Sequence, residues 1–125
     1  MKPIKLIEKT ICDSLQEQVN HAPDRLALKF EDIEFTWMDL DVLSDNLAVE
    51  FMRKGIEKGT HIGIWSDNTP NWIINFFAIL KLGAIPILIN NCYTEHELQR
   101  LLEYADIDFL CYGDMSGACY YEKVV

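Results

Sequence analysis

Three short runs of mainly apolar residues, separated by segments with helical character, constrain the fold of this chain most strongly. The runs span His61–Trp65, Ile85–Ile89 and Asp108–Tyr112. Strands this apolar are typical of a parallel sheet whose two faces are both covered by helices, since neither face then meets water. Parallel neighbours also require crossover connections, which are right-handed. The sequence therefore predicts an α/β fold with three layers, in which helices flank a mainly parallel sheet.

Helix-start signals precede the segments between these strands. Thr36 with Asp39, and Thr94 with Glu97, have the spacing of a capping box, in which each side chain bonds the other residue's backbone N–H. Thr69-Pro70 predicts a cap followed by proline at the first helical position. We expect the helix that starts at Thr36 to end near Gly55, and the helix that starts at Thr69 to end near Gly83. The helix that starts at Thr94 should have one face formed by Leu98, Leu101, Leu102 and Ala105.

The first thirty-five residues predict one helix and a hairpin. The helix should continue to about residue 20, with one apolar face formed by Ile7, Ile11, Leu15 and Val19. Leu26–Phe30 and Ile33–Phe35 predict two short paired strands. Pro86 lacks a ladder donor, which favours an edge, a strand end or a bulge for the strand that contains it.

Charge and cysteine content exclude several classes of partner. The 125 residues include 20 acids and 11 basic residues, a net charge of −9, which argues against a nucleic-acid or anionic-membrane partner. One stretch without any base should form a solvated face; its acids are Glu31, Asp32, Glu34, Asp39, Asp41, Asp45 and Glu50.

Neither the cysteines nor the apolar segments suggest secretion or a membrane span. Four cysteines, at positions 12, 92, 111 and 119, form no CxxC pair, and the first residues lack a secretory apolar core. We therefore expect reduced thiols and a cytoplasmic protein. Lys81, Gly83 and Pro86 interrupt the apolar stretch 72–89, which predicts a helix, a stop and a buried strand.

Few residues carry a signature of chemistry. The sequence contains no GxGxxG, GxxxxGK[ST] or GxSxG motif. His21, His61 and His96 are each isolated, and the expected cap already explains the Glu97 beside His96. We accordingly expect no catalytic, cofactor-binding or metal-binding residue in this chain.

Polar loops that follow the first two parallel strands remain the best place for a site. Ligands of open α/β sheets bind beyond the carboxyl ends of the strands. Ser66-Asp67-Asn68 and Asn90-Asn91-Cys92-Tyr93 lie there. These side chains can hydrogen-bond a ligand, but Asn and Asp are equally the ordinary residues of turns and caps.

Several segments follow one another in a characteristic order: Pro23–Ala27, Phe35–Trp37 with Leu40, Gly55–Gly59, Gly63–Trp72, Ala78–Ala84, Pro86–Asn90 and Tyr93–Leu98. This order, which covers about residues 21–112, resembles the opening of an adenylate-forming (AMP-binding) enzyme of the acyl-CoA synthetase or acid–CoA ligase type. Thr60 and Asn91 depart from the family pattern, where an acid and a proline are common.

The resemblance implies that residues 1–125 are the N-terminal portion of an adenylating domain, truncated before its phosphate-binding loop. The parent enzyme would use ATP, Mg and CoA to adenylate a carboxylate and then form a thioester. This fragment would be an inactive scaffold whose partner is the missing remainder of the enzyme, with self-association through exposed apolar surface. The alternative is a stand-alone small α/β module that binds a ligand or another protein.

Overall fold

The computed structural model describes residues 8–113 and 119–124, and its centre is a four-stranded sheet of order β4-β3-β5-β6. β3 pairs in parallel with both β4 and β5, whereas β6 runs antiparallel to β5. The strands are β3 (His61–Ser66), β4 (Ile85–Leu88), β5 (Phe109–Gly113) and β6 (Cys119–Lys123). The mainly parallel sheet confirms the predicted fold class.

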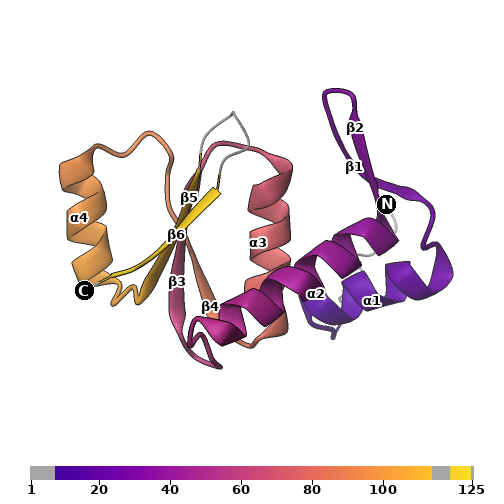
Figure 1. Cartoon of the computed structure of the whole chain (residues 1–125), viewed down its shortest axis with the longest axis horizontal. Helices are drawn as coiled ribbons and strands as arrows, with labels where there is room; N and C mark the ends of the chain where they lie inside the picture. Colours follow the sequence, from indigo (N-terminus) through magenta and orange to yellow (C-terminus); the bar gives the residue numbers. More distant parts are fainter. Residues whose placement is uncertain (1–7, 114–118, 125) are drawn as a thin grey trace, which may run out of the picture.

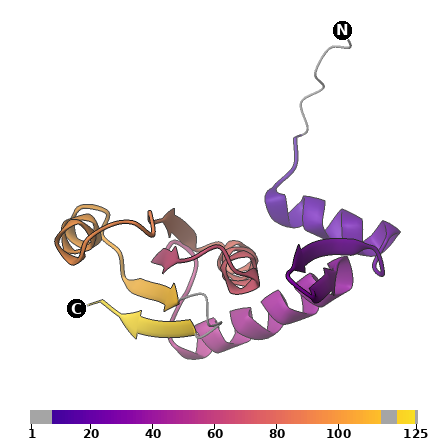
Figure 2. The same ribbon diagram turned by 90° about the horizontal axis from the view of Figure 1, so that it is seen from above.

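Helices cover both faces of this sheet, as predicted. Figures 1 and 2 show α4 on one side, and α3 with the end of α2 on the other. A separate antiparallel hairpin and α1 lie beyond α3. The remaining elements are α1 (Ile11–His21), β1 (Leu26–Phe30), β2 (Ile33–Thr36), α2 (Trp37–Arg53), α3 (Pro70–Lys81) and α4 (Glu95–Tyr104).

Alternation along β3 builds a core on each face. Ile62 and Ile64 belong to the cluster with α2 and α3. Trp65 packs instead with Leu110 in the cluster beneath α4. Because successive strand residues point to opposite faces, one apolar strand supplies both cores.

Gly63 sets how closely the α4 face packs against the sheet. A Cβ built at this position would lie 2.8 Å from the Ile89 side chain and 3.2 Å from that of Leu110. Real side chains do not approach so closely, so any larger residue at 63 would push these neighbours outward. The glycine here serves packing, not a turn.

Pro86 occupies the edge strand β4, one of the predicted placements. The backbone nitrogens of Ile85 and Ile89 donate to carbonyls on or next to β3, those of Thr60 and Ile64. Alternate residues of a strand point their N–H groups to the same side, so the nitrogen of Pro86 faces away from β3. Its missing N–H therefore removes no bond from the sheet.

All three predicted caps are confirmed, but one of them lacks a side-chain bond. Thr36 and Thr94 form complete capping boxes with Asp39 and Glu97. Thr69 is the N-cap residue of α3, but its side chain makes no capping bond. The N–H of Trp72, which the hydroxyl would have accepted, donates instead to the backbone carbonyl of Thr69 at 3.0 Å.

The first helix begins later than its apolar spacing suggested. Thr10 and Asp13 form a further capping box, which starts α1 at Ile11. Leu15 and Val19 are buried as expected, but Ile11 is 51% exposed. Ile7 lies outside the described residues. The local cap, and not the four-residue periodicity, fixes the start of this helix.

The acidic stretch is only partly a solvated face. The Lys81 ammonium on α3 donates to the carboxylates of Asp41 (2.8 Å) and Asp45 (2.7 Å) on α2. Side chains of Lys81 and Asp41 are only 16% and 17% exposed. The prediction was wrong for Asp41 because the neutralising base is forty positions away in the chain.

Beyond β5, the chain returns as an antiparallel edge strand. The sequence predicted a loop entering another element after Gly113; residues 114–118 of that stretch lie outside the described part. β6 is the element that follows. Within the described residues, no helix has both the length and the apolar character needed to cross a membrane.

Candidate functional site at the carboxyl end of the parallel strands

The two predicted polar loops lie next to each other, as parallel topology requires. Asn91 Nδ2, in the loop after β4, donates to Asp67 Oδ1 after β3 at 2.9 Å. This bond joins the loops directly across the end of the sheet. The carboxyl ends of β3 and β4 therefore form one polar surface.

Most other bonds in these loops hold the loops themselves. Asn90 Oδ1 accepts from the backbone nitrogen of Cys92 at 2.9 Å, a turn stabilised by an Asn side chain. Ser66 Oγ donates to the Asp67 carbonyl at 3.1 Å. The Asn90 and Ser66 side chains thus have structural bonds, which supports the turn interpretation of these residues.

A small cavity of about 160 Å³ opens beside the Asp67–Asn91 bond. The ends of three strands contribute to it, and its lining residues are Trp65, Ser66, Asp67, Asn91, Tyr112 and Gly113. Among the described residues, the buried indole N–H of Trp65 has no hydrogen-bond partner. Asn68 and Tyr93, two of the predicted loop residues, line other hollows.

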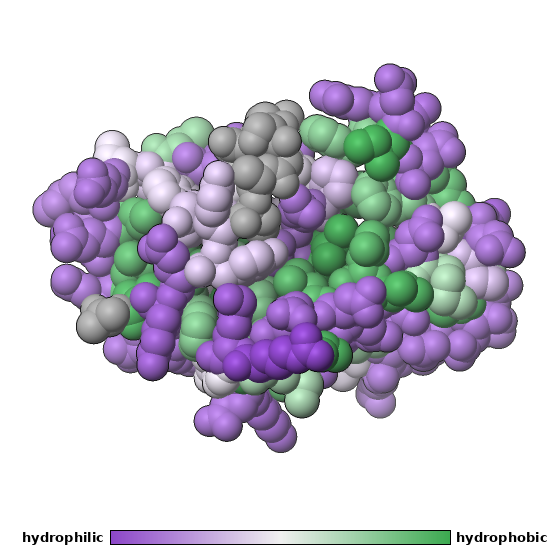
Figure 3. Space-filling view, in the orientation of Figure 1, coloured by the Kyte–Doolittle hydropathy of each residue, from purple (hydrophilic) through white to green (hydrophobic). Residues whose placement is uncertain are grey.

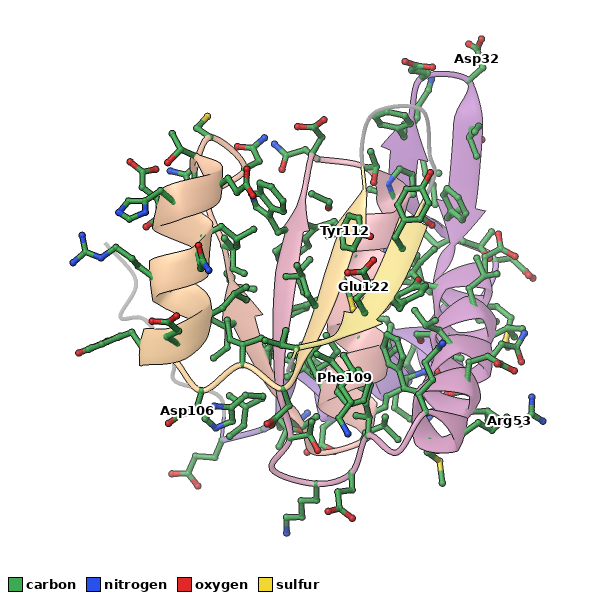
Figure 4. The ribbon with its side chains drawn as sticks, turned by 60° about the vertical axis from the view of Figure 1, so that its left-hand side comes forward. Asp32, Arg53, Asp106, Phe109, Tyr112 and Glu122 are labelled. Carbon is green, nitrogen blue, oxygen red and sulfur yellow. The ribbon has the colours of Figure 1, made fainter. Side chains whose placement is uncertain are left out.

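Tyr112 is a cavity residue that sequence reasoning missed. Its hydroxyl donates to Glu122 Oε1 on β6 at 2.7 Å, and Figure 4 shows the two side chains together on neighbouring strands. That hydrogen bond is the main cause that raises the pKa of Tyr112, with smaller contributions from desolvation and nearby charge. The only available signal was its position at the end of a predicted strand.

The chemistry of this cavity does not fit a nucleotide phosphate. Its lining contains the Asp67 carboxylate and no lysine, arginine or histidine. A triphosphate placed there would meet a negative charge without a compensating cation. The cavity offers hydrogen bonds to a small neutral or cationic group, but no step of phosphate chemistry.

Histidines and acids are dispersed in the part of the chain that the structure describes. His21, His61 and His96 lie on α1, β3 and α4 respectively. The ring Nδ1 of His61 lies 2.8 Å from the Ala105 carbonyl, which ties the start of β3 to the end of α4. In residues 8–113 and 119–124, no three His, Cys, Asp or Glu side chains are grouped in a way that could hold a metal.

The Cys12 thiol shows no sign of activation as a nucleophile. Cys12 and Cys92 are free thiols. Burial raises the pKa of the Cys12 thiol against the opposing influence of Lys81. A raised pKa lowers the fraction of nucleophilic thiolate. Reduced thiols were predicted, and Cys12 and Cys92 agree with that prediction.

A larger hollow lies away from the strand ends, between the hairpin and the start of α3. It has a volume of about 400 Å³ and is mainly apolar; its lining is Leu28, Lys29, Phe30, Asn68, Thr69, Pro70, Trp72 and Ile73. Figure 3 shows apolar residues gathered between the hairpin and α2, with charged residues around them. Apolar surface therefore stays exposed in this hollow, next to the hairpin.

Comparison with known proteins shows which proteins this chain is similar to. The sequence profile described as "AMP-binding enzyme" matches residues 15–123. The candidate acyl-CoA synthetase YngI of Bacillus subtilis (strain 168) is 35% identical over 123 residues, which are 97% of this chain and 22% of YngI. This chain therefore spans about a fifth of the length of that curated relative.

Solved structures agree in fold. The Klebsiella oxytoca NpsA N-terminal subdomain, in complex with 3-hydroxyanthranilyl-AMSN, matches with a TM-score of 0.81 and 26% identity over 86% of this chain and 28% of that one. Bacillus subtilis O-succinylbenzoate coenzyme A synthetase (MenE), in complex with AMP, matches with a TM-score of 0.77 and 27% identity. That match covers 83% of this chain and 27% of the synthetase. From the profile match and these similarities, the chain belongs to the family of AMP-binding enzymes.

Proposed function

We propose that this chain is the N-terminal scaffold segment of an ATP-dependent acid–CoA ligase. The profile match over residues 15–123 carries the proposal, together with the much greater length of the relatives. In the whole enzyme, a carboxylate would be adenylated and then transferred to CoA, with ATP and Mg as co-reactants. Residues 1–125 would form the part of the adenylating domain that precedes its phosphate-binding loop.

The geometry of the strand ends supports a scaffold without its own active site. Ligand pockets for small molecules usually measure about 300–1,000 Å³. The cavity at the strand ends measures about 160 Å³ and contains no basic side chain. The segment would instead supply a sheet with helices on both faces, and further elements of the enzyme would pack against this unit. It would be inactive alone, located in the cytoplasm, and its natural partner would be the remainder of the ligase.

Carboxylate-dependent ATP–pyrophosphate exchange tests this proposal. The 125-residue chain would be assayed with Mg²⁺ and a panel of fatty and aromatic acids, beside a full-length relative as positive control. We expect exchange at the level of a no-protein blank. Exchange well above the blank, dependent on both the chain and an acid, would overturn the scaffold function.

A stand-alone binding module is the second candidate, and the cavity at the strand ends, whose lining includes the polar side chains of Ser66, Asp67 and Asn91, favours it. Calorimetric titration with AMP, ATP and acyl-CoA separates the two functions. Saturable heat that Tyr112→Phe or Asn91→Ala weakens would support the module, whereas absence of heat with all three supports the scaffold.

A further inference from the structure

The cavity at the carboxyl ends of β3 and β5 holds a carboxylate that no cation neutralises. Asp67 lines this cavity, and its Oδ1 accepts from the neutral amide of Asn91. Glu122 accepts in the same way from the neutral hydroxyl of Tyr112, another lining residue. Among the described residues, no basic side chain forms an ion pair with either acid. The negative charge beside the cavity is therefore left for a ligand to balance.

Most hydrogen-bond donors around the cavity are already engaged within the protein. Ser66 Oγ donates to the Asp67 carbonyl at 3.1 Å, and the Tyr112 hydroxyl donates to Glu122 at 2.7 Å. Because a hydroxyl group has a single hydrogen, both oxygens retain only acceptor lone pairs for a further partner. An ionised carboxylate likewise only accepts. A molecule that binds here must therefore bring the donors itself.

The volume and the walls of the cavity restrict what such a molecule can be. The volume of about 160 Å³ corresponds to roughly five water molecules of the liquid. It admits an ammonium group with two or three carbon atoms, whereas a nucleotide is far larger. Trp65 and Tyr112 are both lining residues, and the faces of aromatic rings attract cations. The indole N–H of Trp65 is itself enclosed and offers no donor to the cavity.

A primary ammonium group meets these requirements. It carries a positive charge and three donor hydrogens, and it has no acceptor. A metal ion fits less well, because the described parts of the chain hold no group of three His, Cys, Asp or Glu side chains that could bind one. An anion would meet the Asp67 carboxylate without any basic side chain in the lining.

We propose that this cavity binds a primary ammonium group, which the Asp67 carboxylate and the hydroxyl oxygens of Ser66 and Tyr112 hold. The inference goes beyond the scaffold function and does not depend on it. The ammonium group can belong to a free small amine or to a lysine side chain of another protein segment, since both present the same chemistry.

Titration of the isotope-labelled chain with propylammonium, followed by nuclear magnetic resonance, tests the site. At constant ionic strength, the amide signals of Asp67, Asn91 and Gly113 should shift saturably. The dissociation constant should be on the order of millimolar, because the probe is so small. Propanol has nearly the same size but no charge, and it should cause no saturable shift. No saturable shift with propylammonium, or equal shifts with propanol, would overturn the proposal.

Two identical substitutions separate this site from diffuse attraction by an acidic chain. Asp67→Asn keeps an oxygen that can accept from Asn91 but removes the charge, and should raise the dissociation constant about tenfold. Asp106 lines a different hollow together with Glu103 and Asp108, and Figure 4 shows it far from Tyr112. Asp106→Asn should change the constant by less than about twofold. Circular dichroism checks that both variants fold, and equal weakening by the two would contradict the site.

A lysine derivative distinguishes the two sources of the ammonium group. Nα-acetyl-lysine methylamide carries the same group at the end of a side chain, followed by backbone amides. Tighter binding than that of propylammonium would identify a lysine side chain as the ligand, and equal or weaker binding a free amine. If neither compound binds the parent chain more tightly than the Asp67→Asn variant, the proposal is wrong.

Discussion

The two faces of the sheet are built unequally. On the face of α2 and α3, Ile62, Ile64 and Ile79 are at most 1% exposed. On the α4 face, each buried residue of the cluster retains between 4% and 8% exposure, and α4 itself contributes only one of them, Leu98. Two helices close the first face and one closes the second. The α2/α3 face therefore forms the stable centre, whereas α4 is a thinner added layer.

This inequality raises the question of what holds α4 in place, since α4 buries little apolar surface. Tyr104, at the end of α4, is 91% exposed. Local hydrogen bonds hold the two ends of α4 where apolar contacts are few. The capping box of Thr94 and Glu97 holds its start, and the bond between His61 and the Ala105 carbonyl holds its end. α3 has the opposite balance, with a deep apolar contact and no side-chain cap.

Cavity-forming substitutions on the two faces should give the largest effects. Ile64→Ala should lower the free energy of unfolding by about 4 kcal/mol, and Leu98→Ala by about 2 kcal/mol, because α4 can settle toward the vacancy more readily. Urea unfolding measures both. Native-state hydrogen exchange should also release α4 amides before those of β3. Equal losses in the two variants would contradict the inequality of the faces.

Breaking the Lys81 pairs should give the next largest effect. Lys81→Met leaves the poorly exposed Asp41 carboxylate without its cation, which should cost about 1–2 kcal/mol of unfolding free energy. Arg53→Met removes the exposed pair with Glu50 and should cost less than about 0.5 kcal/mol. Thermal unfolding of the two variants at equal salt checks the order. A reversed order would mean that this contact does not hold α2 against α3.

Two identical cap substitutions sharpen the contrast between α4 and α3. Thr94→Val removes a hydroxyl that accepts from the Glu97 N–H and should cost about 1 kcal/mol. Thr69→Val removes a hydroxyl that makes no capping bond, and it should cost less than about 0.5 kcal/mol. Urea midpoints measured side by side decide the matter. A larger loss at position 69 would show that the α3 cap acts through its hydroxyl after all.

The smallest expected effect concerns the pH dependence of the contact between β5 and β6. The folded-state pKa of Tyr112 is raised above its ordinary value of 10.0. The Tyr112–Glu122 bond should therefore contribute fully below pH 10 and be lost as pH rises through the folded-state pKa. The stability difference between the parent and Tyr112→Phe should disappear in that range. Spectrophotometric titration should show one phenolate fewer at high pH in the variant.

Local signals in the sequence predicted most elements of this fold. Apolar runs placed β3, β4 and β5 within one or two residues, because strands covered on both faces leave little room for polar side chains. The capping boxes at Thr36 and Thr94 were readable for a similar reason, since a cap is satisfied by residues three positions apart. β6 gave no such signal, because its residues, Cys119–Lys123, form neither an unbroken apolar run nor an alternation of polar and apolar side chains.

The sequence did not predict the side-chain contacts between segments that lie far apart in the chain. The Lys81–Asp41 pair and the Tyr112–Glu122 bond each depend on which elements the fold places together. Parallel topology did place the two polar loops side by side, and the Asn91–Asp67 bond confirms that placement. The absence of catalytic, cofactor-binding and metal-binding residues stays a prediction, as does a cytoplasmic location.

Pro86 hinders the addition of a further strand at the outer side of the edge strand β4. A strand arriving at the outer side of β4 would find carbonyl groups at positions 86 and 88 but a donor only at Leu88. Recruitment of foreign strands, the first step toward amyloid-like stacking, is thereby hindered along this border. Restoring the amide with Pro86→Val should make the chain more prone to fibril formation on prolonged incubation, although the fold itself would change little.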